Sequence, residues 1–502
     1  MAVNTSLNPL ADDEFGLPQA RHLLRRTAFG PEPGRARMLA DMGLDAAVDA
    51  LADYHDLPTD ALPMPDADPD LIRPPTPEER RERAVARRQG DQDTLDRFNT
   101  ERLRRRYQDR EMLQQLQQWW LELMIRTPRP LEENLTLLWH DHFATRHRNV
   151  RSTYQMLQQN AMLRRAAAGN FADLALGIVR DPAMLRFLNN DRNRSAEPNE
   201  NLARELMELF TLGVGNYTEQ DIQEAARALT GYHVQHNDFH FNVRQHDHGP
   251  KQILGRRERF DGDGLTLHLL RQNACAQFVA YKLYRYFVAD VDPDRASADQ
   301  VAVIRDLGTL VRRHEYRLAP VLKTIFKSQH FYDAAVVGRK IKSPAQLLVG
   351  TVRMMRTPPR EPKALRITMM HLGQELFDPP SVAGWDVGRA WVNTSTLFTR
   401  QNLCLYLLTG HPAVAGASND RQPYDPTPLV AHLPDEQRTP ERVVDELVDQ
   451  LVGDHIPAPR REPLVRELQR RAGSGGAGQR VTADALVPVL VLITTMPEYQ
   501  LC

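Results

Sequence analysis

The chain has 502 residues and a balanced charge, with 64 Lys and Arg residues against 65 Asp and Glu residues and a formal net charge of −1. No overall field therefore draws the protein towards nucleic acid or an anionic membrane, and we expect no nucleic-acid partner. The cysteines (Cys275, Cys404 and Cys502) are too few for a disulfide framework and lack the CxxC spacing of a thiolate metal site.

Neither end of the chain is typical of a membrane segment. The apolar run "ALVPVLVLITTM" near the C-terminus is shorter than the roughly 18 residues of a transmembrane helix, and it contains Pro488. The first residues, "MAVNTSLNPLADDEFG", have neither a basic segment nor an apolar core, so they do not resemble a signal peptide. The sequence as given predicts a soluble, cytoplasmic protein without a transmembrane segment.

Helical periodicity dominates the chain, which predicts a mainly α fold built as a large multi-helix single core. Strand-like alternation around Phe239, Phe241 and Val243 predicts a short β-hairpin or an extended loop near 233–255. Runs rich in proline divide the chain. The predicted divisions are N-terminal helices over 1–60, a proline-rich linker over 61–79, a main helical domain with a polar cluster over 80–410, a linker over 411–440 and a C-terminal helical unit over 441–502.

The segment Arg80–Arg110 is rich in charge, with eleven arginines and six acids. Mixed charge of this kind is typical of a solvated helical hairpin held by ion pairs. A nucleic-acid surface would need interleaved aromatic residues or glycines, and the segment offers only Phe98 and Tyr107. The pattern does not say whether the hairpin docks on the core or projects from it.

An acidic motif, "PNENLARELMELFTLGVGNYTEQDIQEAARALTGY", spans residues 198–232 and predicts two helices joined by a short turn. Glu205 and Glu208 are three residues apart and share one side of the first helix. Because Glu205 borders the stripe of leucines, we expect it to face inward. Asp221 follows Thr218 in the pattern of a capping box, which by itself accounts for that carboxylate.

Two groups of histidines accompany this motif. His140 and His142 flank Asp141 in "HDH", at the end of an apolar helical run, and residues i and i+2 point about 200° apart on a helix. Both histidines therefore reach one ion only if the helix ends there. The loop "QHDHGPKQILG" adds the candidates His246, Asp247 and Lys251.

Six segments together resemble a large bacterial family called domain of unknown function 1800. They are "RHLLRRTAFG", "RTPRPLEENLTLLWHDHF", the acidic motif, "HDHGPKQILG", "PPSVAGWDVGRAWVN" and "TTMPEYQL", in the family's order and over nearly the whole chain. The resemblance implies a mostly helical, single-module protein and supplies no established activity. It also implies export and a sulfatase-like partner protein, because members often carry an export signal and their genes often lie beside those of a sulfatase-like family. This chain departs from that pattern by lacking such a signal.

The residues that fit the family pattern are mostly polar, whereas a motif that served packing alone would be chiefly apolar. They are His140, His142, Glu200, Asn201, Arg204, Glu205, Glu208, Asp221, Glu224, His246, Asp247 and Lys251.

The first hypothesis for function is a metal-dependent enzyme with a site of histidines and carboxylates between helices. The metal ligands are His140, His142, Glu205 and Glu208, and the ion is Zn, Mn, Fe or Cu. The catalytic residues are His246, Asp247, Lys251 and Arg204. The first two of these serve as ligand or general base, and the two cations stabilise developing negative charge. The reaction, hydrolytic or oxidative, and the substrate, a small molecule or a polymer, stay open.

The alternative is a non-catalytic scaffold or partner protein, in which acids and arginines form a buried ion-pair network and Trp385 and Trp391 line a recognition groove. A remote third hypothesis, a haem-peroxidase-like oxidoreductase, rests on a fainter likeness and lacks a proximal histidine in "TLGVGNYT". The positions of the side chains distinguish the metal-enzyme hypothesis from the scaffold hypothesis. A metal site brings His140, Glu205 and His246 within about 2 to 2.5 Å of one point, whereas a scaffold pairs glutamates with arginines and histidines with backbone.

Overall fold

Helices make up most of the protein. The computed structural model describes residues 3–502 apart from 59–61, 359, 421, 454–455 and 473–480. Its helices, accompanied by two small two-stranded antiparallel sheets, confirm the predicted mainly α fold class. Parts of the predicted linker at 61–79 and of the predicted C-terminal unit at 441–502 lie outside the described residues. The boundaries of the predicted segments stay predictions.

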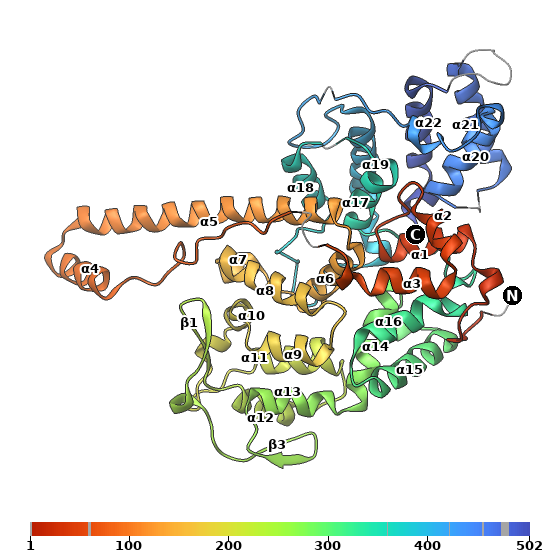
Figure 1. Cartoon of the computed structure of the whole chain (residues 1–502). Helices are drawn as coiled ribbons and strands as arrows, with labels where there is room; N and C mark the ends of the chain where they lie inside the picture. Colours follow the sequence, from red (N-terminus) through yellow and green to blue (C-terminus); the bar gives the residue numbers. More distant parts are fainter. Residues whose placement is uncertain (1–2, 59–61, 359, 421, 454–455, 473–480) are drawn as a thin grey trace.

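The first three helices pack along one side of the body (Figure 1). They are α1 (Leu17–Thr27), α2 (Arg35–Met42) and α3 (Leu44–Ala52). Helix α3 buries Leu44, Val48 and Leu51, which recur at helical spacing, and it packs against α16 (Leu318–Lys327). The buried side chains of α1, α3 and α16 belong to one cluster, so the N-terminal helices share the core of the middle of the chain.

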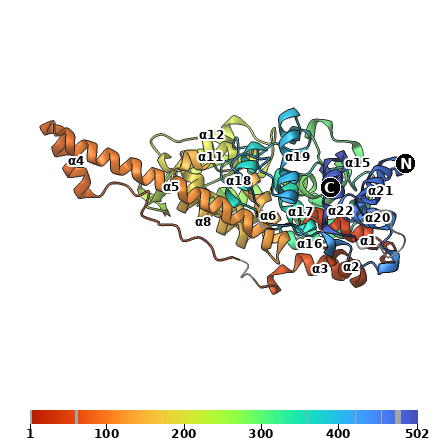
Figure 2. The ribbon, with the colours of Figure 1, turned by 90° about the horizontal axis from the view of Figure 1, so that it is seen from above.

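A helical hairpin projects from the body, and we call residues 77–110 the arm (Figure 2). Helix α4 (Pro77–Gln89) begins with a capping box between Thr76 and Glu79, and α5 (Gln92–Arg126) runs back into the body over 35 residues. All buried residues of α5 lie at or after Asp109, and they include Leu116 and Trp120. The hairpin predicted for this segment therefore exists, and its outer half points away from the core.

Helix α6 (Pro130–His142) lies between two clusters of buried apolar side chains. Leu135 and Trp139 belong to the first cluster, with α1, α3 and the middle of the chain. Leu137 belongs to the second, with the buried half of α5, α17 (Pro344–Met355) and α19 (Thr394–Thr409). Almost every residue of α6 is buried, which is what a helix enclosed on all sides requires of its sequence.

The remaining helices complete the two halves of the body. In the middle of the chain these are α7 (His147–Val150), α8 (Thr153–Arg165), α9 (Phe171–Val179), α10 (Pro182–Phe187), α11 (Asn201–Glu205), α12 (Glu219–Ala228), α13 (Gly262–Leu270), α14 (Asn273–Phe287) and α15 (Ala298–Arg313). Later in the chain come α18 (Pro362–His371), α20 (Pro440–Leu451), α21 (Ala458–Ala472) and α22 (Ala483–Thr495). Helix α11 continues without a break into a π-helix, Leu206–Thr211.

Two hairpins occupy the region where the sequence predicts a hairpin or loop. Strands β1 (Tyr232–Gln235) and β2 (Asp238–Phe241) pair with Tyr232 opposite Phe241. Strands β3 (Lys251–Ile253) and β4 (Arg256–Glu258) are joined at Leu254 and Gly255, which both have positive φ, as a type I′ turn requires. Short antiparallel strands near 233–255 are thus confirmed.

Helix α22 packs onto α19, and α20 and α21 pack against α22 and each other. Residues near 500 return to the body, where Leu501 forms a β-bridge with Ile341. Helix α22 is apolar but only 13 residues long, and α5 is long but highly charged. Among the described residues, no helix combines the length and the apolar character needed to cross a membrane.

Candidate functional site

His140 lies on the side of α6 that faces the second cluster and is 1% exposed. Its Nε2 accepts a hydrogen bond from the backbone N–H of Phe377 at 3.1 Å, which places the ring proton on Nδ1. Burial among aromatic rings, with Trp120 and Trp385 among them, lowers the pKa of His140 to about 3. The imidazole is therefore neutral, and the lone pair of Nε2 is already used by the chain itself.

His142 lies on the opposite side of α6, in the first cluster, and is 3% exposed. Its Nε2 donates a hydrogen bond to the backbone carbonyl of Phe210 at 3.0 Å. Burial, followed by the charge of Lys282, holds the pKa of His142 well below its usual range. The two histidines contact different aromatic groups on two faces of one helix, as the angle of about 200° between positions i and i+2 requires.

Glu205 and Glu208 lie at the junction of α11 and the π-helix. Glu205 is partly buried, so the expected inward orientation holds only in part, and no hydrogen bond or ion pair reaches it from any described residue. Burial raises its pKa, and the neighbouring charge of Glu208 raises it further. Glu208 accepts a hydrogen bond from the hydroxyl of Tyr217. Arg204 pairs instead with Glu219 at 2.8 Å and with Glu200 at 3.1 Å.

The loop after β2 is fastened to α12 through Arg227. Its Nε donates to Asp247 at 2.7 Å, and its Nη1 donates to Glu224 at 2.7 Å. The same two acids hold the loop backbone, because Asp247 accepts from the N–H of Gly249 at 2.8 Å and Glu224 accepts from the N–H of Gln252 at 3.1 Å. The arginine holds the pKa of Asp247 below its usual range.

The other candidates of this loop bind backbone as well. Lys251 donates from Nζ to the carbonyls of Asp247 and Gly249, and His246 lies with Nδ1 2.8 Å from the carbonyl oxygen of Thr230. Burial lowers the pKa of both Lys251 and His246. Asp221 caps α12 through Thr218, as predicted, and its second oxygen accepts from the N–H of Leu254 at 2.7 Å.

The proposed metal ligands do not converge. Within the described parts of the chain, no three His, Cys, Asp or Glu side chains are placed to share one ion. His140, His142 and His246 each hydrogen-bond to backbone, as the scaffold hypothesis expects. The acids divide between the two hypotheses: Glu224 and Asp247 pair with Arg227, whereas no described arginine pairs with Glu205 or Glu208.

Asp141, between the two histidines, faces a third direction that the sequence reasoning passed over. Its Oδ1 accepts a hydrogen bond from the N–H of Trp385 at 2.6 Å. Gly384 adopts a left-handed φ of 92°, and a Cβ there would lie 2.3 Å from this oxygen, so only glycine fits. Burial raises the pKa of Asp141 and lowers that of nearby Lys282 to about 8. The glycines around Trp385 in "SVAGWDVG" are the signal that could have revealed this contact.

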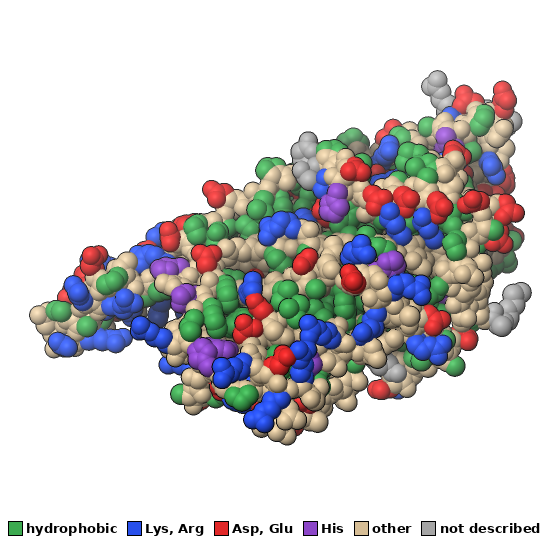
Figure 3. Space-filling view, turned by 60° about the horizontal axis from the view of Figure 1, so that its bottom comes forward, with side chains coloured by type: hydrophobic (Ala, Val, Ile, Leu, Met, Phe, Trp, Pro, Cys, Tyr) green, Lys and Arg blue, Asp and Glu red, His purple; other side chains and the backbone are tan. Residues whose placement is uncertain are grey.

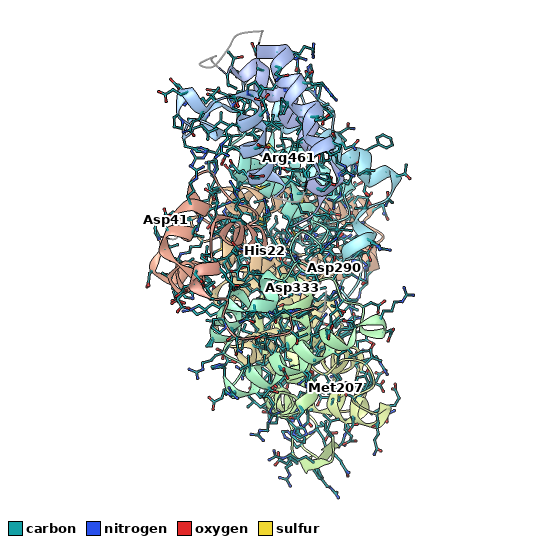
Figure 4. The ribbon with its side chains drawn as sticks, turned by 90° about the vertical axis from the view of Figure 1, so that its right-hand side faces the viewer. His22, Asp41, Met207, Asp290, Asp333 and Arg461 are labelled. Carbon is teal, nitrogen blue, oxygen red and sulfur yellow. The ribbon has the colours of Figure 1, made fainter. Side chains whose placement is uncertain are left out.

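A cavity of about 40 Å³ lies beside Asp141 and is lined by Trp385, Trp391, Tyr286 and Lys340. Lys340 pairs with Asp290. Asp290 lies near the middle of the body, away from Met207 on the π-helix, so this cavity is separate from the region of Glu205 and Glu208 (Figure 4). The predicted tryptophan groove is thus a small cavity with room for a few water molecules, whereas sites for drug-sized ligands occupy roughly 300–1,000 Å³.

A larger cleft of about 410 Å³ separates α1 and α2 from α20. Glu446 lies in it, 10% exposed at the side chain, between Arg21 at 3.2 Å, Arg37 at 3.3 Å and His432 at 3.3 Å. No sequence pattern points to this cleft, because its walls lie more than 400 residues apart along the chain.

Sequence comparison places these features in a family. No curated protein and no solved structure matches the chain. The family described as "Protein of unknown function (DUF1800)" matches residues 22–501, which include every site residue discussed above except Arg21 at the edge of the cleft. The chain therefore belongs to the DUF1800 family.

Proposed function

We propose that the protein is a non-catalytic scaffold that binds a partner protein, and that its polar family residues fix distant segments of its own chain. The observation that carries this proposal is that both histidines of α6 hydrogen-bond to the backbone of distant segments. His140 and His142 hold the backbone of Phe377 and Phe210, which lie 237 and 68 residues away in sequence. A neutral, enclosed imidazole that already binds backbone has a structural role without any ligand.

The acids support the same proposal. Asp221, Glu224 and Asp247 accept hydrogen bonds from three backbone N–H groups of one loop, at Leu254, Gln252 and Gly249. A hydrogen bond to a charged acceptor is stronger than one between neutral groups, and two of these three, at Leu254 and Gly249, are partly buried. The polar motif then positions the β3–β4 hairpin. The sulfatase-like protein implied by the family resemblance is the first partner to test.

The test compares two acids of α12. Asp221→Ala removes the acceptor of the Leu254 amide, whereas Glu219→Ala removes an acid of the same helix that is exposed and contacts Arg204 instead. We expect hydrogen exchange of residues 251–258 to become at least about tenfold faster in Asp221→Ala and to stay unchanged in Glu219→Ala. Elemental analysis of the wild-type protein is expected to find no stoichiometric metal. Equal exchange in the two variants, or a bound metal lost in His140→Ala, would contradict the scaffold proposal.

A second candidate, the metal-dependent enzyme, is favoured by one observation. Glu205 has no hydrogen-bond partner among the described residues and directly precedes a π-helix, an element that often occurs at functional sites. Burial and then the charge of Glu208 raise the pKa of Glu205, and a cation beside the two carboxylates would offset both effects. His246, Asp247, Lys251 and Arg204 would then serve as catalytic residues, in a hydrolytic or oxidative reaction. Zn, Mn, Fe or Cu that is bound by the wild type and lost in Glu205→Gln would establish this candidate.

A further inference from the structure

The arm has a surface that neither proposed function explains. It projects from the body in both views, and its helix α4 buries a single residue, Ala86 (Figures 1 and 2). Over residues 77–110 it carries eleven arginines and eight acids, in a chain whose net charge is −1. The arm is therefore positive while the rest of the chain is negative.

Many of these arginines are unpaired. Arg97 pairs with Glu82, and Arg104 and Arg105 pair with Glu101. No acid lies within 4.0 Å of seven exposed arginines among the described residues, and Lys and Arg side chains gather on the arm at the left of Figure 3. These seven are Arg80, Arg81, Arg87, Arg88, Arg102, Arg106 and Arg110.

The unpaired arginines on α5 form a row. Arg102, Arg106 and Arg110 are spaced four residues apart, so they follow one face of the helix. Beside this row lie two large apolar side chains that are strongly exposed, Leu103 at 61% and Tyr107 at 64%. A row of cations next to a row of apolar side chains is the complement of an acidic amphipathic segment.

A groove of about 230 Å³ continues this surface between α4, α5 and the preceding chain. Leu71, Ile72 and Phe98 give it an apolar lining. Its arginines are Arg73, Arg83, Arg102, Arg105 and Arg106, and its acids are Glu79 and Glu101. Two of the unpaired arginines in the row therefore also line the groove.

We propose that the arm binds an acidic amphipathic segment of a partner protein, with carboxylates against Arg102, Arg106 and Arg110 and apolar side chains against Leu103 and Tyr107. This proposal rests on the scaffold function and names the chemistry of the partner. The segment is helical, because carboxylates at every fourth position then match the spacing of the arginine row.

A nucleic acid fits this surface less well. Its phosphates form an unbroken row of negative charge, which Glu79 and Glu101 in the groove repel. Arg83 and Arg97 lie near the ring of Phe98, at 5.7 Å and 5.2 Å from its centroid, so a base that stacked there would compete with two guanidinium groups. A peptide can place neutral side chains opposite the two acids.

The experiment measures binding by the full-length protein to a fluorescent helical peptide of about 20 residues, with glutamates at every fourth position and leucines beside them. Fluorescence anisotropy is recorded at an ionic strength of about 0.15 M. The variant Arg102→Glu/Arg106→Glu is compared with Arg87→Glu/Arg88→Glu, which makes the same charge change outside the groove. We expect affinity to fall at least about tenfold in the first and less than about twofold in the second. Leu103→Ser/Tyr107→Ser is expected to weaken binding about fivefold.

Four results would overturn the proposal. They are no binding of the peptide to the wild type, equal loss in the two arginine pairs, tighter binding of single-stranded DNA or of phosphatidylglycerol vesicles than of the peptide, and a dimer in sedimentation that only the groove variant loses. Circular dichroism shows whether each variant is folded. Failure here leaves the hydrogen-exchange test of Asp221→Ala untouched, so the arm and the scaffold proposals are judged separately.

Discussion

Helix α6 and the arm both contain many polar residues, but those in α6 are bound inside the protein whereas those on the arm are exposed to solvent. In α6, His140, Asp141 and His142 lie in the interior and each binds the backbone of a distant segment. On the arm, seven exposed arginines have no acid within 4.0 Å among the residues that the structure describes. Polar residues that bind the chain itself stabilise a fold, whereas polar residues without internal partners are free to bind another molecule.

The largest expected effect on stability comes from a substitution that places an atom against the carboxylate of Asp141. Gly384→Ala places a methyl group 2.3 Å from Oδ1 of Asp141 at a φ of 92°, so the loop carrying Trp385 must move. We expect a loss of about 3–5 kcal/mol in the free energy of unfolding, from overpacking and backbone strain together. Denaturant unfolding measures the loss.

Gly43→Ala is the matched control for Gly384→Ala. Gly43 has a φ of 79°, and no atom lies within 4 Å of a Cβ built there, so this substitution isolates the strain. We expect it to cost about 1 kcal/mol. Similar losses in the two variants would mean that Gly384 is needed for its φ alone and that Asp141 does not hold the loop.

The two buried histidines predict a dependence of stability on pH. Their folded pKa values are depressed, to about 3 for His140 and well below the usual range for His142, so the unfolded chain binds more protons below its own pKa of about 6.5. Their contribution is complete above that value and is lost as the pH falls towards the folded pKa. Between pH 7 and pH 5 each histidine then removes about 2 kcal/mol.

His140→Leu separates this contribution from that of other groups. The variant is less stable at pH 7, because the N–H of Phe377 loses its acceptor, but its stability should fall by about 2 kcal/mol less than that of the wild type between pH 7 and pH 5. His411→Leu, which removes an exposed histidine, is the control variant. An unchanged slope in His140→Leu would show that His140 is not neutral in the folded protein.

The sequence predicts the local features of this comparison well. The capping box of Asp221, the opposite directions of His140 and His142 and the strands near 233–255 all follow from spacing within a few residues. Each is set by backbone geometry that neighbouring residues determine, so a short window of sequence is enough.

The partners of these residues could not be predicted in the same way. The amide that His140 accepts from comes from Phe377, and nothing near position 140 indicates which loop supplies it. The role of Asp141 is not readable from its neighbours for the same reason, since it depends on Gly384 and Trp385. The sequence left open whether the arm docks or projects, and the structure settles it, since the buried residues of α5 begin only at Asp109.

Two arginines, Arg227 and Arg204, test whether an ion pair stabilises the fold more when its acids also bind backbone. Arg227 holds Asp247 and Glu224, which bind loop backbone, whereas Arg204 holds Glu219, which is 70% exposed at the side chain. Replacement by Lys keeps the charge and removes the forked geometry. We expect Arg227→Lys to cost about 1–1.5 kcal/mol and Arg204→Lys less than about 0.5 kcal/mol in thermal or denaturant unfolding. Equal losses would argue against a special role for the loop.

The smallest effect on stability is expected for substitutions in the exposed outer half of α5. Substitutions in the buried half of the same helix should have a large effect. Arg102→Glu/Arg106→Glu changes exposed side chains that pair with no acid in the described part of the chain, so the free energy of unfolding should stay within about 0.5 kcal/mol of the wild type. Met124→Ala, in the buried half of α5, removes a side chain that is fully buried in the second cluster and should cost about 2–5 kcal/mol. A loss above about 1 kcal/mol in the arginine pair would mean that the outer half of α5 is stabilised by contacts with the body, and the arm would then be part of the fold rather than a surface for a partner.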